Sequence, residues 1–311
     1  MITRTERNEE IQKKIIKEEN RETRKKIVLT SLKIIIIIIL LSVTFYLYTS
    51  YVSSKIITVK EERIINEKIP SNFNGLKIIQ ISDIHYGSTI FIKDIKKIVN
   101  MVNQRTPDLV VFTGDLINKD YKLTSKEQEN LIKELKKIKS TIGKYAIMGE
   151  EDSNEFNTIM NQSNFTILNN SYDLIYKDNN TPILLIGINN NKNNLDINSA
   201  YDYFNQPTHN SNIYTIALLH QPDTVDKILE EYPTDLFLAG HSHNGQVNLP
   251  YIGGVFQKNG AQKYINEFYQ LESSKLYISS GIGTTGNGFR LFCGPSINFF
   301  RLSSNEVLYP S

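Results

Sequence analysis

Hydrophobic and polar positions divide the chain into two parts that meet near residue 50. Residues 34–54 carry no charged side chain, and six consecutive isoleucines run from Ile34 to Ile39. From residue 55 onward, short apolar runs alternate with polar turns and with segments whose apolar side chains recur at helical spacing. The first pattern predicts one membrane-spanning helix, and the second predicts a globular domain.

The predicted membrane helix covers residues 27–49. At about 1.5 Å per residue it would be roughly 34 Å long, which exceeds the ~30 Å hydrocarbon core of a bilayer. A basic run at 24–26 precedes it, so the positive-inside rule predicts a cytoplasmic segment over 1–26 and an extracytoplasmic domain, with a short tether, over 50–311. A cleaved signal peptide is the alternative, but its apolar region is normally only about 7–15 residues long.

The first half of the domain alternates strands with helices. One helix is predicted around residues 95–102, where apolar side chains stand at i, i+3, i+4 and i+7. A second is predicted over residues 125–139, with Ser125 and Gln128 as its capping box. Because these helices separate apolar runs, the order predicts an α/β fold. The strands are expected near residues 55–68 and at 76–82, 109–113 and 145–148.

The second half of the domain shows strands with fewer helices between them. The apolar runs at 165–168, 174–176 and 183–188 have no long helix between them, so we expect a second, largely antiparallel sheet. A helix is expected at about 224–230. Further strands are expected at 214–219, 236–239, 277–280 and 297–302.

Charge and cysteine content exclude some classes of protein. The net charge is +2, but residues 1–33 alone carry ten Lys/Arg and six Glu, a net of +4, which leaves the remainder near −2. The domain therefore has no basic field for nucleic acid. The single cysteine, Cys293, cannot form an intrachain disulfide and is expected to be a small core residue.

Four of the five histidines directly follow strand-like runs, and carboxylates follow others. In an open α/β sheet, ligands bind beyond the carboxyl ends of the strands, so these side chains are expected to converge on a metal site. If the strand continued, Asp83 and His85 would share a face and reach one ion, and His241 and His243 have the same spacing. The fifth histidine, His209, is expected in a surface loop. The candidate positions are Asp83, His85, Asp115, residues 149–152, His220, His241 and His243.

The order of these motifs resembles that of the calcineurin-like metallophosphoesterase superfamily over roughly residues 55–303. The nearest group looks like membrane-anchored bacterial phosphoesterases related to lipid-sugar pyrophosphatases. The resemblance implies a two-sheet α/β sandwich flanked by helices, and two divalent ions (Mn, Fe, Zn or Ni) with an aspartate between them. It rests on Asp83-x-His85, Gly114-Asp115, the Gly149 turn, His220 and Gly240-x-x-His243. It implies that Asp83, His85, His243 and Asp115 hold one ion, and that Asp115, His220, His241 and Glu150 hold the other.

One motif departs from the family pattern. The family has Gly-Asn-His-Asp or Gly-Asn-His-Glu where this chain has Gly149-Glu150-Glu151-Asp152. Glu150 can ligate a metal through oxygen or can be a solvated loop residue. Glu151 can act as a general acid only if its pKa is raised, and is otherwise a bystander; Asp152 is the second catalytic candidate. The departure weakens the case for monoester hydrolysis more than the case for metal binding.

Two further residues are candidates for substrate binding. Asn244 can contact a phosphate oxygen or can simply belong to the turn before Gly245. Arg290 can bind a substrate phosphate or can lie on a strand.

Together these features predict a dinuclear metal-dependent phosphoesterase. It would hydrolyse phosphodiester or pyrophosphate bonds at the outer membrane face by attack of a metal-bridging hydroxide. The substrate would be a phosphate-containing small molecule or a lipid-linked molecule. The pair Glu150–Glu151 motivates an alternative, a catalytically weakened pseudo-phosphoesterase that serves as a surface binding module. A soluble cytosolic phosphatase is disfavoured by the uncharged stretch 34–54.

Overall fold

The chain divides into an N-terminal unit, Met1–Thr49, and a domain, Ser50–Ser311. The computed structural model describes residues 4–178, 181–189, 195–286 and 288–305. In the first unit, helix α1 runs from Arg4 to Leu47, and a π-helical turn, η1, follows at Tyr48–Ser53. Among the described residues, this is the one helix that is long and apolar enough to cross a membrane. The predicted cytoplasmic segment is helical from Arg4 and continues into the apolar stretch, and its residues 1–3 lie outside the described residues.

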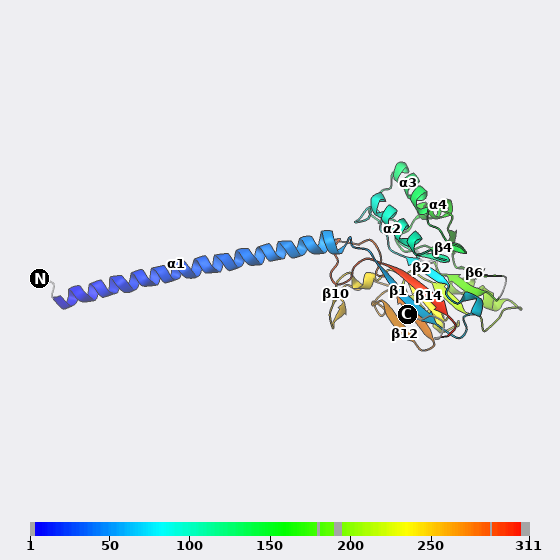
Figure 1. The fold of residues 1–311 in the computed structure, drawn as a ribbon. Helices are drawn as coiled ribbons and strands as arrows, with labels where there is room; N and C mark the ends of the chain where they lie inside the picture. The colour runs from blue at the N-terminus through cyan, green and yellow to red at the C-terminus, as the bar shows by residue number, and fades with distance from the viewer. Residues whose placement is uncertain (1–3, 179–180, 190–194, 287, 306–311) are drawn as a thin grey trace. The chain divides into compact units, whose positions relative to one another are not determined.

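The first sheet has the strand order β1-β14-β2-β3-β4-β5. Figure 1 labels its strands β1, β14, β2 and β4. Strands β2 to β5 are parallel, with Ile79 opposite Val110 in the register of β2 and β3. Strand β14 pairs antiparallel with β2 and parallel with β1. The strands are β1 (Thr58–Ile65), β2 (Lys77–Ile81), β3 (Leu109–Thr113), β4 (Gly143–Ile147), β5 (Thr166–Ile167) and β14 (Ser296–Ser303).

The second sheet has the order β12-β13-β9-β8-β7-β6, and its four central strands are parallel. Only the edge strands β6 and β12 pair antiparallel with their neighbours. The expected antiparallel pairing is therefore confirmed for the runs at 174–176 and 183–188 and is wrong for the centre of the sheet. The apolar run at 165–168 was also misassigned, because β5 pairs with β4 in the first sheet. The strands are β6 (Ser171–Ile175), β7 (Ile183–Gly187), β8 (Thr215–Leu218), β9 (Leu236–Ala239), β12 (Phe268–Leu271) and β13 (Ser274–Ile278). A separate small hairpin pairs β10 (Asn248–Leu249) with β11 (Gly253–Gly254).

Helices cover the outer faces of the sheets. The capping box of α3 differs from the predicted one: Thr124 is the N-cap and Glu127 its partner, one residue earlier than Ser125 and Gln128. Helix α4 was not predicted. The α-helices of the domain are α2 (Ile92–Gln104), α3 (Ser125–Leu135), α4 (Asn154–Gln162), α5 (Ile197–Ala200) and α6 (Val225–Leu229); the 3-10 turns are η2 (Ser71–Phe73), η3 (Asp202–Asn205), η4 (Pro222–Thr224) and η5 (His243–Gly245).

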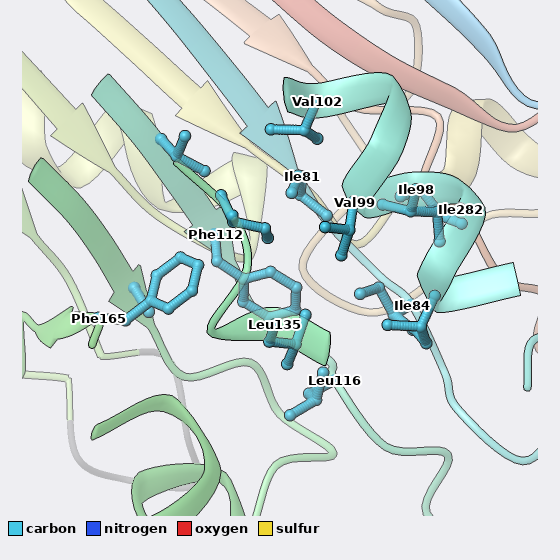
Figure 2. Packing of buried hydrophobic residues seen from close by; sticks show 14 of the residues in the cluster. Ile81, Ile84, Ile98, Val99, Val102, Phe112, Leu116, Leu135, Phe165 and Ile282 are labelled. Atoms are coloured by element: carbon cyan, nitrogen blue, oxygen red, sulfur yellow. The ribbon is translucent and has the colours of Figure 1, made fainter. Parts of the chain in front are cut away.

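Three hydrophobic clusters hold the domain together, and all of their buried residues lie beyond residue 56. Successive residues of β2 point to opposite faces: Ile78 packs between the two sheets, whereas Ile79 packs under the helices. Figure 2 shows the helix-side cluster, where Val99 and Val102 of α2 lie against Ile81 and Phe112 of the sheet. The strands are therefore buried on both faces, as their continuous apolar runs predict.

This sandwich brings the carboxyl ends of strands from both sheets to one edge. Buried Gln80 joins the sheets there, because its Nε2 donates to Thr113 Oγ1 at 3.0 Å and to the Ala239 carbonyl at 2.8 Å. Loops after β2, β3 and β4 of the first sheet meet loops after β8 and β9 of the second. All of the predicted metal ligands lie in these loops.

Candidate metal centre

The backbone turns sharply at the predicted ligands. Strand β2 ends at Ile81, and Asp83 (φ 52°) and His85 (φ 43°) both adopt left-handed conformations, as do Asp115, His241 and His243. The idea that Asp83 and His85 share a face of a continuing strand is therefore wrong. Repeated left-handed residues cost free energy and persist where the surroundings hold them, which is typical of functional sites.

The first ligand group consists of Asp83, His85 and His243, all fully buried. His243 Nε2 lies 3.1 Å from His85 Nε2 and 3.3 Å from Asp83 Oδ1, and His85 Nε2 lies 3.8 Å from the same carboxylate oxygen. Ligands at about 2.0–2.1 Å from one ion in tetrahedral geometry are roughly 3.4 Å apart. The three side chains thus have the separations of ligands around a single ion.

The second ligand group consists of Asp115, His220 and His241, also buried. His220 Nδ1 lies 2.7 Å from the Thr113 carbonyl and so carries a proton, which leaves Nε2 facing Asp115 Oδ2 at 3.1 Å. His241 Nε2 lies 2.7 Å from the Asn259 carbonyl, so His241 Nδ1 is its ligand atom. That Nδ1 is buried and has no hydrogen-bond partner among the described residues. A metal ion is the partner that this arrangement fits.

Asp115 stands between the two groups. Its Oδ1 accepts a hydrogen bond from the Glu151 backbone N–H at 3.0 Å. Its Oδ2 lies 3.8 Å from His85 Nε2 and 3.1 Å from His220 Nε2, so one oxygen faces a histidine of each group. A Cβ at Gly149 would come within 2.2 Å of Asp115 Oδ1, which explains the glycine in this motif. The resemblance assigns the bridging position to Asp115, and the geometry is compatible with it.

His241 and His243 have the same spacing as Asp83 and His85 but belong to different groups. The difference arises in the turn after β9, where both histidines and Asn244 have positive φ. Spacing alone would have placed both side chains on one ion. The division agrees with the one that the resemblance implies.

Glu151 contacts the first group from behind. Its Oε2 lies 3.1 Å from His85 Nδ1 and accepts the Lys119 backbone N–H at 3.2 Å. Burial alone would raise the pKa of Glu151, but the hydrogen bond with His85 and the charge of His85 lower it below its ordinary value. Glu151 is therefore a carboxylate at neutral pH, and the general-acid expectation is not supported by this geometry. Its contact with Nδ1 leaves His85 Nε2 facing Asp83 and His243, where an ion held by this group would lie.

Glu150 faces the second group from the open side. Its Oε1 lies 3.5 Å from His241 Nδ1, and its Oε2 accepts a hydrogen bond from Gln221 at 2.9 Å. Burial raises the pKa of Glu150, and Asp115 raises it further. Because its Oε1 lies beside His241 Nδ1, Glu150 can contribute an oxygen to an ion held by Asp115, His220 and His241. A cavity of about 780 Å³ borders both glutamates and is lined elsewhere by Lys119, Tyr121 and Lys122.

Asp152 also borders this cavity, but its carboxylate is turned inward. It is buried, and its two oxygens accept backbone N–H groups from Asp115 at 2.8 Å, Leu116 at 2.8 Å and Gly149 at 2.9 Å. Burial and then Asp115 raise its pKa to about 7, while the three backbone donors act in the opposite direction. Asp152 therefore fixes the loop that carries Asp115, and we correct its assignment from catalytic to positioning.

The two predicted substrate contacts are also turned inward. Arg290 is fully buried, and its guanidinium donates to the carbonyls of Ser280, Gly281 and Gly283 behind His243. Asn244 donates to Glu267 at 3.0 Å and accepts from Asn248 at 2.6 Å. Both side chains hold the turns around the first ligand group, so direct substrate contact is not supported for either.

The buried charges of the site compensate one another. Burial alone would raise the pKa of Asp83, but the surrounding His243, His220 and His85 hold it well below its usual value. Burial lowers the pKa of His241 to about 4, and neighbouring His220 and Lys258 add to this shift. His241 is thus a neutral imidazole at physiological pH, which is the form that binds metal.

Lys258 is a site residue that sequence reasoning missed. It lies outside every motif, in the loop after the β10–β11 hairpin, yet its charge acts on Glu150, His241 and His243. Gln221, directly after His220, was also missed, although its position beside a motif histidine was a signal for it.

Comparison with known proteins agrees with these observations. The sequence model of the calcineurin-like phosphoesterase family matches residues 76–245. The uncharacterized metallophosphoesterase YkuE of Bacillus subtilis is 30% identical over 84% of this chain and 91% of its own length. Phosphodiesterase YaeI of Escherichia coli is 23% identical over 74% of this chain and 83% of its own length. UDP-2,3-diacylglucosamine pyrophosphatase LpxG of Chlamydia muridarum is 25% identical over 75% of this chain and 86% of its own length.

Proposed function

The chain belongs to the calcineurin-like phosphoesterase family, and from this premise we propose that it hydrolyses phosphodiester or pyrophosphate bonds with two divalent metal ions. The observation that carries the proposal is the position of Asp115 Oδ2, which faces a histidine of each ligand group. Ions held by the two groups would make a water acidic and would neutralise the phosphoryl oxygens. Mn, Fe, Zn and Ni all suit such sets of imidazoles and carboxylates.

The residues of the chain have separable tasks in this proposal. Asp115 ties the two ion positions together, and Asp152 fixes the loop that carries it. Glu151 orients His85, and Glu150 completes the ligands of the second ion. The positive charge of Lys258, which acts on His241, would attract the phosphate of the substrate. Because Glu151 is held as a carboxylate, the chain supplies no proton donor at the family's histidine position.

The missing acid favours substrates with good leaving groups. An anhydride releases a phosphate, which needs less protonation than an alkoxide, and a diester carries less negative charge than a monoester at the carboxylate-rich site, so we propose these two classes before monoesters. Relatives named phosphodiesterase and pyrophosphatase are consistent with this choice. The apolar helix supports a single-pass membrane anchor, and we propose that the domain is extracytoplasmic and meets a lipid-linked or soluble phosphate substrate at the outer face.

Turnover and metal content test the proposal together. The full-length protein, loaded with Mn²⁺, should hydrolyse a generic diester, and Asp115→Asn should reduce turnover by at least about a hundredfold, since even outer-shell losses cost 10–100-fold. Gln270→Ala, in the remote strand β12, is the matched control and should leave turnover unchanged. Full activity in Asp115→Asn would overturn the assignment. Protease access to the domain in intact cells tests its orientation.

A second function is favoured by one observation, the pair of glutamates at 150 and 151. An extra negative charge beside the ions would strengthen binding but reduce their attraction for substrate oxygens. The chain would then be a metal-binding pseudo-phosphoesterase that recognises a ligand at the surface. Two bound ions without turnover of diester, anhydride or monoester substrates would favour this alternative.

A further inference from the structure

We infer that the β10–β11 hairpin and the adjacent loop 288–295 form a surface that docks onto the lipid bilayer. This docking surface consists of Tyr251, Ile252, Val255, Phe256 and Phe292. Tyr251 is fully exposed, Ile252 is 75% exposed and Phe292 is 69% exposed. Contiguous exposed apolar side chains on a soluble domain mark an interaction surface, and aromatic residues are enriched where proteins meet the headgroup region.

The side chains of the docking surface lie on two segments that are joined. Val247 forms a β-bridge with Leu291, and the Asn248 N–H donates to the Leu291 carbonyl at 3.0 Å. The rings of Phe256 and Phe289 meet edge to face with centroids 6.3 Å apart. The tip residues Tyr251 and Ile252 and the loop residue Phe292 therefore belong to one end of the domain, where β10 lies in Figure 1.

The base of the hairpin is held tightly while its tip is free of the core. A Cβ at Gly245 would come within 2.5 Å of Gly254 Cα, and a Cβ at Gly254 would come within 2.6 Å of Ile265 Cγ2. Backbone and side chains thus meet closely below the tip. No described side chain of the core clusters belongs to the tip residues 250–252. A fixed base with an exposed apolar tip suits shallow insertion into a membrane interface.

The length of the connecting segment limits how far this end of the domain can lie from a bilayer that the apolar helix spans. The predicted membrane span ends at Thr49 and β1 begins at Thr58, so the connecting residues 50–57 reach at most about 30 Å. The Thr58 N–H donates to the Pro295 carbonyl at 3.0 Å, which places the start of β1 beside the loop that carries Phe292. The tether thus enters the domain next to the docking surface. A short tether also keeps the local concentration of bilayer high.

Charge favours a membrane over a cationic partner. Neither residues 246–259 nor residues 288–295 contain an Asp or Glu, and Lys258 adds a positive charge near the hairpin. An anionic bilayer surface therefore meets no repulsion here. The docking surface itself does not depend on whether the metal centre hydrolyses phosphate.

Tryptophan fluorescence tests the docking surface, because the chain contains no tryptophan. Full-length Tyr251→Trp, Phe256→Trp and Phe292→Trp variants would be reconstituted in vesicles of phosphatidylcholine with phosphatidylglycerol. Tyr176→Trp is the matched control, since Tyr176 is 52% exposed directly after β6, away from the hairpin. We expect emission at shorter wavelength and at least about twofold stronger quenching by dibrominated lipids at the three docking positions than at residue 176.

Two outcomes of this experiment would overturn the inference. Equal quenching at residues 176 and 251 would show that the hairpin does not enter the interface. A shift to shorter wavelength without lipid quenching, growing with the protein-to-lipid ratio, would show that a second copy of the chain covers the hairpin. As a second measurement, Tyr251→Ser with Ile252→Ser should abolish quenching of the Phe256→Trp reporter, and unchanged quenching there would also count against docking.

Discussion

The two ligand groups of the metal centre are built from the same residue types but differ in their surroundings. Asp83, His85 and His243 are closed in by Glu151, Arg290 and backbone carbonyls. Asp115, His220 and His241 are also buried, but they border Glu150, which is 36% exposed and lines the cavity. The departure from the family motif therefore acts differently on each group. Glu151 orients a ligand of the closed group, whereas Glu150 adds a carboxylate to the open group.

Removing one histidine from each ligand group should have the largest effect and tests whether the two groups bind separate ions. His85→Ala should remove the ion of the closed group, and His241→Ala should remove the ion of the open group, because each loses a ligand that its remaining partners cannot replace. Metal analysis by mass spectrometry should give one ion per chain in each variant. His209→Ala is the control and should leave both ions bound, since His209 is exposed in a loop. Loss of both ions in both variants would contradict the separation into two groups.

Neutralising Glu150 or Glu151 should have a smaller effect, because it weakens the affinity of one group for its ion without removing a histidine ligand. Glu151→Gln removes the charge that orients His85 and should weaken the ion of the closed group by about 10–100-fold. Glu150→Gln keeps an oxygen near His241 and should weaken only the ion of the open group. Competition titrations with a chelator would measure the two affinities. If Glu151→Gln affected the open group alone, the assignment of Glu151 would be wrong.

A substitution at Lys144 should change the stability of the domain without affecting either ligand group of the metal centre. Burial, with a contribution from Lys136, lowers its pKa to about 8 from an ordinary 10.5. Because the pKa of Lys144 is lower in the folded state than in the unfolded state, burying its charge lowers the free energy of unfolding by the full amount below pH 8. The free energy of unfolding then rises as the pH increases from 8 towards 10.5. Lys144→Met should raise the free energy of unfolding at pH 7 by about 1–3 kcal/mol and flatten that rise.

Chemical denaturation from pH 7 to 10.5 would measure the effect of Lys144→Met. The Lys144 ammonium donates to the Ser163 carbonyl at 2.6 Å, and losing that bond offsets part of the gain. The metal content should stay that of the wild type. A variant with the same pH dependence as the wild type would show that Lys144 is not the group responsible.

The smallest expected effect concerns the cap of α3, also remote from both groups. Thr124 Oγ1 accepts the Glu127 N–H at 3.3 Å, so Thr124→Ala should cost about 1 kcal/mol of stability. Ser125→Ala should cost much less, because Ser125 lies inside the helix. Equal losses of thermal stability in Thr124→Ala and Ser125→Ala would instead support the capping box that the sequence predicts, with Ser125 as the N-cap. Neither variant should change the metal affinity of either group.

The fold could be predicted where local pattern and tertiary structure agree. Strand β3 has the predicted bounds, and the α/β order of the first half is confirmed. The second sheet was mispredicted because β7, β8 and β9 are parallel although their connections contain only short helices. Strand orientation depends on how the chain crosses over, and an apolar run of four or five residues does not encode that path.

The residues of the site were predictable as a set, but several of their roles were not. Spacing puts His241 and His243 together, whereas the left-handed turn separates them. Arg290 and Asp152 have the residue types of substrate contacts, yet burial turns both toward backbone groups. Lys258 belongs to no motif, and only the path of the chain brings it to the site. Such roles depend on contacts between distant segments, which one sequence does not reveal.

The central claim is that Asp115 holds two ions together, and electron paramagnetic resonance of the Mn²⁺-loaded full-length protein tests it most directly. Two ions that share Asp115 should give an exchange-coupled signal at two Mn²⁺ per chain. Asp115→Asn should replace that signal with the spectrum of isolated Mn²⁺ and lower the occupancy of the open group. An uncoupled spectrum in the wild-type protein, or a coupled spectrum that survives in Asp115→Asn, would contradict the account.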